Sequence, residues 1–248
     1  QQAHFAYKVS TGLIPEAPTI KVACDEHFIS PSPWEKWEEA KSVCLNAVVT
    51  AAFTKEMDPD SLTDHILVEQ CTTQNPDGKC GVWSAVTGVL VSSAVSFTWT
   101  PSTLVPNTRY RVTVDGGENG VRAAEVAGGA AMTNDYSWEF TTAGANDVCE
   151  VGGVNVSPAD FTATIDHQQI GYASQLIAKN HQCLTIACAG QTIAWSSTDA
   201  GAVVQNPTSG AGLCSTVVVA EEQTQGAPAK IKAQVTNAVN QPSDTGNL

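Results

Sequence analysis

The sequence predicts an all-β protein built from two disulfide-stapled β-sandwiches in tandem. Short runs rich in Val, Thr, Ile and aromatic residues alternate with clusters of Gly, Pro, Asn and Asp, the pattern of strands and turns. About seven such runs occur in each half, which is typical of a sandwich. The length of 248 residues also fits two domains of ordinary size.

The first half supplies seven predicted strands and one helix. The strands are residues 19–23, 47–53, 65–69, 88–92, 95–100, 109–115 and 136–142. Alternation of apolar and polar residues in 110–114 and 138–140 predicts strands with one buried face. A short helical insertion is expected at 32–40, because Ser32 can cap a helix that begins with Pro33 and carries Glu35 in its first turn.

The second half supplies seven more predicted strands: 153–157, 161–165, 172–178, 192–197, 202–205, 215–220 and 229–236. Small and polar residues at 143–147 mark the expected boundary between domains at 17–145 and 146–240.

The two ends of the chain suggest a longer array. Residues 5–12 repeat the alternating aromatic and polar pattern of 136–143, so residues 1–16 are interpreted as the last strand of a preceding domain plus a linker. The alternative is an ordinary N-terminal strand of the first domain. The polar residues 241–248 are expected to form another linker.

Charge and hydropathy exclude several classes of partner. Lys and Arg number 12 and Asp and Glu number 25, which gives a net charge of −13. Nucleic acid and anionic membranes need basic neutralising residues, so neither is an expected partner. No apolar run approaches the roughly 18–20 residues of a membrane span, so membrane insertion is not expected either.

Cysteine usage predicts an oxidising compartment outside the cell. Four cysteines precede residue 145 and four follow it, which predicts two independently bonded domains. The eight are Cys24, Cys44, Cys71, Cys80, Cys149, Cys183, Cys188 and Cys214. The alternative is reduced or metal-bound thiols, but zinc sites favour tighter spacings than those found here.

The residues between the cysteines and the order of the cysteines in the sequence suggest the disulfide pairs. Cys71 and Cys80 flank an Asn-Pro-Asp-Gly turn, so they are expected to staple a loop or a hairpin. Cys24–Cys44 is expected in the first domain. Cys149–Cys183 with Cys188–Cys214 is one of three connectivities open to the second.

Several motifs of the first half resemble one family. A strand ends at Phe53 and is followed by a polar pair and Met57-Asp58-Pro59-Asp60-Ser61, which resembles the signature of bacterial Ig-like domains of the SbsA/Big_5 type. Residues 97–104, 108–114 and 135–142 resemble its later strands in the same order. The resemblance implies an immunoglobulin-like sandwich, with the helix and the Cys71–Cys80 loop as insertions.

The second half is similar to Big_2-like bacterial Ig domains. The similar segments are 154–158, 172–173, 193–199 and 229–233. Together the two resemblances imply an extracellular, multidomain bacterial surface protein without catalytic residues.

Acidic clusters are the candidates for metal binding. Asp58, Asp60 and Asp64 could hold calcium by their spacing, but the full EF-hand loop is absent and Asp-Pro-x-Ser also makes a capped turn. The loop 115–120 has the same two interpretations, with a hairpin tip favoured. No histidine carries a recognisable nucleophile partner motif, so we expect no catalytic residue, metal or cofactor.

Three tryptophans lack an evident core position. Trp34 and Trp37 lie on the expected helix and Trp83 follows Cys80, so together they could form a binding surface. The alternative is a helix that packs its Trp face onto the sandwich.

Three functions follow as expectations. The leading one is a structural or adhesive module of a bacterial surface or filament protein, whose partners are other domains or subunits of the same assembly. The second is a module that binds a glycan or a host or partner surface protein. The third is a non-catalytic accessory region of a secreted hydrolase.

Overall fold

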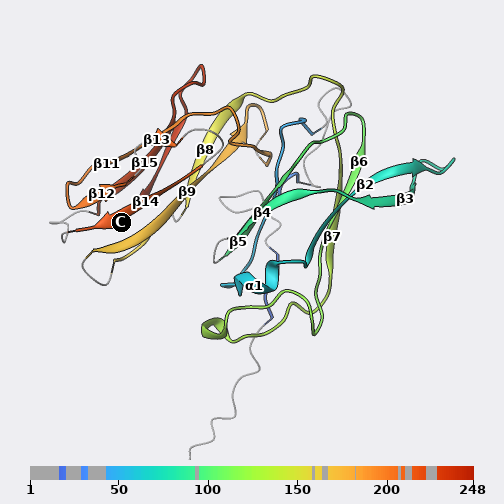
Figure 1. Ribbon diagram of the computed structural model, residues 1–248, viewed down its shortest axis with the longest axis horizontal. Coiled ribbons are helices and arrows are strands. Elements are labelled where there is room, and N and C mark those ends of the chain that lie inside the picture. The colour runs from blue at the N-terminus through green and yellow to red at the C-terminus, as the bar shows by residue number, and fades with distance from the viewer. Residues whose placement is uncertain are drawn as a thin grey trace, which may run out of the picture.

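Two β-sandwiches form the protein, as the sequence predicts (Figure 1). The structure is a computed structural model of the chain. It describes residues 17–20, 29–32, 43–92, 95–157, 160–163, 167–181, 183–205, 208–209, 214–221 and 228–248. The expected N-terminal strand within 1–16 and the expected helix with Trp34 and Trp37 lie outside the described residues.

The first sandwich pairs a three-stranded sheet with a four-stranded sheet. The three-stranded sheet has the order β1 (Val49–Ala52), β5 (Ser96–Pro101) and β4 (Gly88–Ser92). The four-stranded sheet has the order β3 (Cys80–Ala85), β2 (Ile66–Gln74), β6 (Arg109–Val114) and β7 (Tyr136–Thr141). All strand pairs within these two sheets are antiparallel, and β2 and β3 form a hairpin that projects beyond the sheet (Figure 1).

Alternation along the strands builds the first core. Tyr110, Val112 and Val114 of β6 are buried while the residues between them are partly exposed. The Tyr110 ring stacks on that of Phe140 in β7, with centroids 5.3 Å apart. The period of two read from the sequence therefore places the correct face inward.

A short capped helix closes one end of this core. Helix α1 (Pro59–Leu62) begins with proline, and the Asp58 side chain accepts a hydrogen bond from the Asp60 N–H at 3.1 Å. Met57 and Leu62 on either side of the cap are buried. The Met-Asp-Pro-x-Ser motif is thus a turn that inserts two apolar side chains into the sandwich. A 3-10 turn, η2 (Glu125–Ala127), lies in the β6–β7 connection.

The second sandwich also has two sheets. One contains β10 (Thr185–Ile186), β9 (Gln168–Ala178), β14 (Ser215–Ala220) and β12 (Ala202–Val204), with β8 (Val151–Ser157) on the other edge of β9. The other has the order β13 (Thr208–Ser209), β11 (Ile193–Ser197), β15 (Lys230–Val235) and β16 (Ser243–Asn247). The boundary predicted between residues 145 and 146 falls in the connection from β7 to β8.

The linker predicted for residues 241–248 is wrong, because β16 is a strand of the second sandwich. It pairs with β15 from Lys230↔Asn247 to Gln234↔Ser243. Its composition favours turns, but Asp244 Oδ2 accepts a 2.7 Å hydrogen bond from the Val156 N–H and so links β16 to β8. Tertiary contacts override the weak strand propensity of these residues.

Smaller differences also separate prediction and structure. Strands β3, β10 and β13 were not expected. Phe161–Ala163, within an expected strand, has no regular secondary structure. The Phe161 N–H instead donates to the Asn247 carbonyl at 3.0 Å, which fixes this segment beside the end of β16.

Candidate functional site

A disulfide joins the two ends of the first sandwich at the start of the second. Cys44 bonds to Cys149, with Cα atoms 5.6 Å apart and a sequence separation of 105 positions. The predicted pairs Cys24–Cys44 and Cys149–Cys183 are therefore wrong. So is the expectation that no disulfide joins the two groups of four cysteines.

Backbone pairing at the ends of the first sandwich explains this bond. The Val43 N–H donates to the Thr141 carbonyl at 3.0 Å, and the Ala143 N–H donates to the Val43 carbonyl at 2.8 Å. The Leu45 N–H donates to the Asp147 carbonyl at 2.8 Å. This pairing brings Cys44 beside the segment that leads to Cys149, a proximity that cysteine order alone does not reveal.

The side chain of Asn46 completes the connection around the disulfide. Its Nδ2 donates to the Cys149 carbonyl and its Oδ1 accepts from the Cys149 N–H, both at 3.0 Å. One amide side chain thus satisfies both backbone groups of the bonded cysteine.

Strand β10 of the second sandwich pairs with the same segment of the first. The Val48 N–H donates to the Thr185 carbonyl at 3.1 Å, and the Ala187 N–H donates to the Asn46 carbonyl at 2.8 Å. Ala47 and Ile186 form an antiparallel bridge. The two domains are therefore joined by backbone hydrogen bonds as well as by the disulfide.

Buried hydroxyl groups form further hydrogen bonds at this junction. The Ser30 backbone exchanges hydrogen bonds of 2.9 and 2.8 Å with Thr50, and the Ser30 Oγ accepts from the Thr185 N–H at 2.8 Å. The Thr185 hydroxyl donates to the Val48 carbonyl at 3.3 Å. Ser30, Thr50 and Thr185 are all buried. Because buried polar groups are costly without partners, these bonds favour one fixed arrangement of the two domains.

The remaining described disulfides lie within single domains. Cys71–Cys80 and Cys188–Cys214 pair as predicted, with Cα separations of 5.6 and 5.8 Å. Cys183 is also disulfide-bonded, and Cys24 lies outside the described residues. No described cysteine is free.

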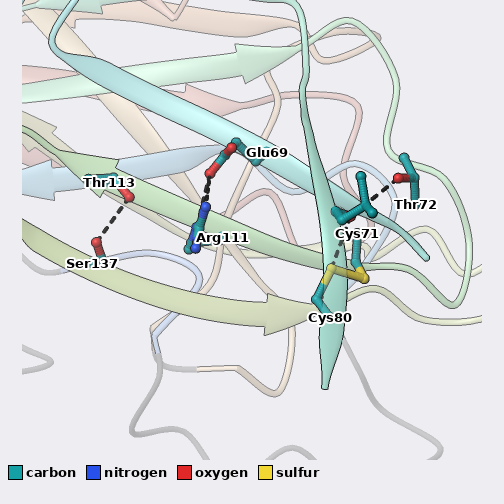
Figure 2. A network of polar contacts seen from close by, with 8 residues as sticks. Glu69, Cys71, Thr72, Cys80, Arg111, Thr113 and Ser137 are labelled. Carbon is teal, nitrogen blue, oxygen red and sulfur yellow. Dashed lines mark hydrogen bonds and ion pairs between the residues drawn. A yellow bond between two sulfur atoms is a disulfide. The ribbon is translucent and has the colours of Figure 1, made fainter. Parts of the chain in front are cut away.

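Trp83 lies under a cation at the base of the Cys71–Cys80 hairpin. The Arg111 guanidinium carbon is 4.6 Å from the Trp83 ring centroid, a cation–π contact. Figure 2 shows Arg111 held in place by Glu69, whose Oε2 accepts from Nε at 2.9 Å and from Nη2 at 2.6 Å. One face of Trp83 is thereby occupied. The binding surface predicted from Trp34, Trp37 and Trp83 stays a prediction.

The acidic candidates are arranged as turns. Asp58 caps α1 through the Asp60 N–H, and Asp64 has a positive φ of 68° just after the helix. Among the described residues, Cys44, Cys149 and His181 form the single group with potential ligand atoms close together. The sulfur atoms of that group form a disulfide, so they are not the thiolates that a metal needs.

A small open depression lies next to the junction. Its volume is about 240 Å³, and its lining includes Glu150, Lys179, Asn237 and Val239. Lys179 Nζ lies 2.7 Å from Glu150 Oε2, and this hydrogen bond lowers the pKa of the exposed Glu150 carboxyl. The depression is smaller than the roughly 300–1,000 Å³ of typical small-molecule pockets.

Comparison with known proteins assigns the first sandwich to a family. Residues 37–142 match the sequence model of the bacterial Ig-like domain Big_5. The first sandwich is therefore a bacterial Ig-like domain, as its motifs predict. Membership of this family supports a structural or surface role for the domain and a surface or extracellular location for the protein. In the described part of the chain, neither helical segment is long and apolar enough to cross a bilayer.

Two solved structures share low overall similarity with the chain. The crystal structure of the S-layer protein rSbsC(31-844) is 12% identical with a TM-score of 0.30, over 83% of this chain. The chain spans 24% of that protein's length. The D00-D0 domain of Intimin is 11% identical with a TM-score of 0.26, over 83% of this chain and 85% of that one. No curated protein matches.

Proposed function

We propose that the chain is a non-catalytic, load-bearing section of a bacterial surface or filament protein. The Cys44–Cys149 disulfide is the observation that carries this proposal. It closes the segment that contains β1 to β7, so tension applied outside the two cysteines cannot extend the 105 positions between them.

The non-covalent contacts at the junction support the same role. Val48 and Ala47 pair with β10 and Asn46 with Ala187 just after it, so bending between the domains would break backbone hydrogen bonds and expose buried hydroxyl groups. A section that has to transmit force benefits from a stiff joint, whereas a flexible tether is rich in Gly, Ser or Pro and makes few contacts.

The chemistry of the chain supports a location outside the cell. Structural disulfides persist in oxidising compartments and are rare in the cytosol. The net charge of −13 favours solubility and opposes non-specific association. The partners proposed are other domains or subunits of the same surface assembly.

The alternatives receive less support. A glycan-binding platform needs exposed aromatic faces, but Arg111 covers one face of Trp83. An adhesive role toward a host or partner protein and an accessory role in a secreted hydrolase fit the same fold, since fold alone does not determine function.

Single-molecule stretching tests the load-bearing role. In the oxidised chain, unfolding should release no extension from the segment closed by Cys44 and Cys149. After full reduction, unfolding of this segment should release up to about 350–380 Å more, because the 105 positions can then extend to about 3.3–3.6 Å each. Equal lengthening in the oxidised and reduced chains would contradict the proposal.

A pair of variants isolates the junction bond. By loop-closure entropy, Cys44→Ser/Cys149→Ser should lose about 2 kcal/mol more stability than Cys71→Ser/Cys80→Ser, because the loops span 105 and 9 positions. Urea unfolding measures the difference. Equal losses in the two variants would remove the special role assigned to the junction.

A further inference from the structure

Strand β4 forms one edge of the first sandwich, and its outer side has no partner strand among the described residues. It is the end strand of its sheet and pairs with β5 from Gly88↔Pro101 to Ser92↔Phe97. No described residue pairs with its other side. Val89 and Val91 are 65% and 64% exposed, which are large values for β-branched apolar side chains in a strand.

The hydrogen-bond register identifies the backbone groups that face outward. The Ser102 N–H donates to the Thr87 carbonyl at 3.0 Å, so Thr87 is at a hydrogen-bonded position opposite β5. Antiparallel pairing alternates, so Val89 and Val91 also direct their N–H and C=O groups to β5. Gly88, Leu90 and Ser92 therefore direct theirs to the free edge.

The edge lacks the usual protection against strand addition. Natural sheets protect their edges with charged side chains, proline or bulges. Residues 81–108 contain no Asp, Glu, Lys, Arg or His, although the chain carries a net charge of −13. The register between β4 and β5 is also regular, without a bulge.

We propose that β4 pairs in antiparallel orientation with β4 of a second copy of this chain, about a two-fold axis at Leu90. In this register Leu90 faces Leu90 of the second copy, and Gly88 faces Ser92. These three pairs supply about six backbone hydrogen bonds. Val89 then lies opposite Val91 of the second copy at a non-hydrogen-bonded position, with Cα atoms about 4.5 Å apart.

A second copy can meet this edge without bringing like charges together, because residues 81–108 of both chains are uncharged. Two chains of net charge −13 repel each other over most of their surfaces, and the uncharged β4 edge allows the closest approach with the least repulsion. A two-fold arrangement also places the exposed face of β4 on both sides of the interface, so Val89 and Val91 each gain an apolar partner. The proposal does not depend on the load-bearing role.

Analytical ultracentrifugation of the full oxidised chain tests the pairing. The wild type should form a dimer over the micromolar to millimolar range. Val91→Lys should weaken association at least tenfold, because it places an ammonium group opposite Val89 of the second copy. Val148→Lys is the matched control, since Val148 is also 64% exposed, lies outside any strand, and the variant has the same net charge.

Each result of this comparison decides the proposal. A wild type that stays monomeric throughout, or a Val148→Lys variant that dissociates as much as Val91→Lys, would overturn it. Unchanged melting temperatures for both variants ensure that the loss of association is not a loss of folding.

Disulfide trapping tests the register. A mixture of Val89→Cys and Val91→Cys chains should form a covalent heterodimer under mild oxidation, because those positions lie opposite each other. Each variant alone should crosslink at least tenfold more slowly, because identical positions are diagonal and farther apart. Equal crosslinking in all three samples would overturn the Leu90-centred register.

Discussion

The two sandwiches are closed by different kinds of contact. The first is closed covalently, because Cys44 and Cys149 join the two ends of its chain segment. The second is closed by β16, which reaches β8 through Asp244 and pairs with β15 along its length. A covalent closure survives local opening, whereas a strand held by hydrogen bonds can detach. We therefore expect the second sandwich to depend more strongly on its last residues.

A buried tyrosine in each sandwich repeats this contrast. The Tyr110 hydroxyl accepts a 2.8 Å hydrogen bond from the N–H of Val105, five residues away. The Tyr172 hydroxyl donates at 3.0 Å to the carbonyl of Asn247, 75 residues away. The first bond fixes a local corner of the kind found in immunoglobulin-like domains. The second bond holds the C-terminal strand in place.

Removal of residues 243–248 should have the largest effect. It deletes β16, the partner of β15, and leaves the Tyr172 hydroxyl without its acceptor. We expect the second sandwich to lose most of its hydrogen-exchange protection while β2, β6 and β7 keep theirs, because Cys44–Cys149 still closes the first. Exchange measured by mass spectrometry separates the two domains. Retained protection of β8 and β15 would contradict the dependence on β16.

A milder variant serves as the control for this deletion. Asp244→Asn keeps the strand and its backbone pairing but weakens the hydrogen bond from the Val156 N–H, because a neutral amide accepts less strongly than a carboxylate. Protection should fall only slightly in this variant. A collapse as complete as that of the deletion would mean that one side chain, and not the strand, closes the sandwich.

Sequence patterns predicted the parts of the fold that local physics determines. Strands β5, β6 and β7 lie close to their expected positions because alternation marks their buried faces. The Cys71–Cys80 pair followed from the turn between its cysteines. By contrast, β16 has the residues of a linker and becomes a strand only through contacts with residues 9 or more positions away.

The junction could not be predicted for a related reason. Cys44 and Cys149 are 105 positions apart, and their proximity follows from the pairing of Val43 with Thr141 and Ala143. That pairing depends on where both ends of the sandwich emerge, which is a property of the whole fold. The expectation that cysteines adjacent in sequence order pair with each other predicts Cys24–Cys44 instead.

Substitution of Tyr172 should have an intermediate effect that depends on pH. Tyr172→Phe removes the bond to Asn247 and should cost about 1–1.5 kcal/mol at pH 9. Burial, with a smaller contribution from the Asp160 charge, raises the pKa of Tyr172 from 10 to about 12. The unfolded tyrosine therefore ionises first, and the wild type loses stability as the pH rises from 10 to 12.

Phenylalanine cannot ionise, so the deficit of Tyr172→Phe should shrink at pH 11. Urea unfolding of both chains at the two pH values measures this change. Tyr110→Phe is the matched variant in the first sandwich, where burial also raises the pKa of the tyrosine and the Val105 N–H opposes the rise. A deficit of Tyr172→Phe that stays constant across the two pH values would show that the hydroxyl does not ionise differently in the folded and unfolded chains.

The smallest expected effect concerns the cap of α1 in the first sandwich. Asp58→Ala removes the acceptor of the Asp60 N–H and should cost about 0.5–1 kcal/mol, because the cap is partly exposed. As a cap, Asp58 acts without calcium, so the cost should be equal with calcium and with a chelator. If Asp58, Asp60 and Asp64 instead bound the ion, calcium would raise the melting temperature of the wild type and not that of the variant. Thermal unfolding of both chains in the two solutions separates these interpretations. A difference in melting temperature that depends on calcium would contradict the interpretation as a cap and support a metal site.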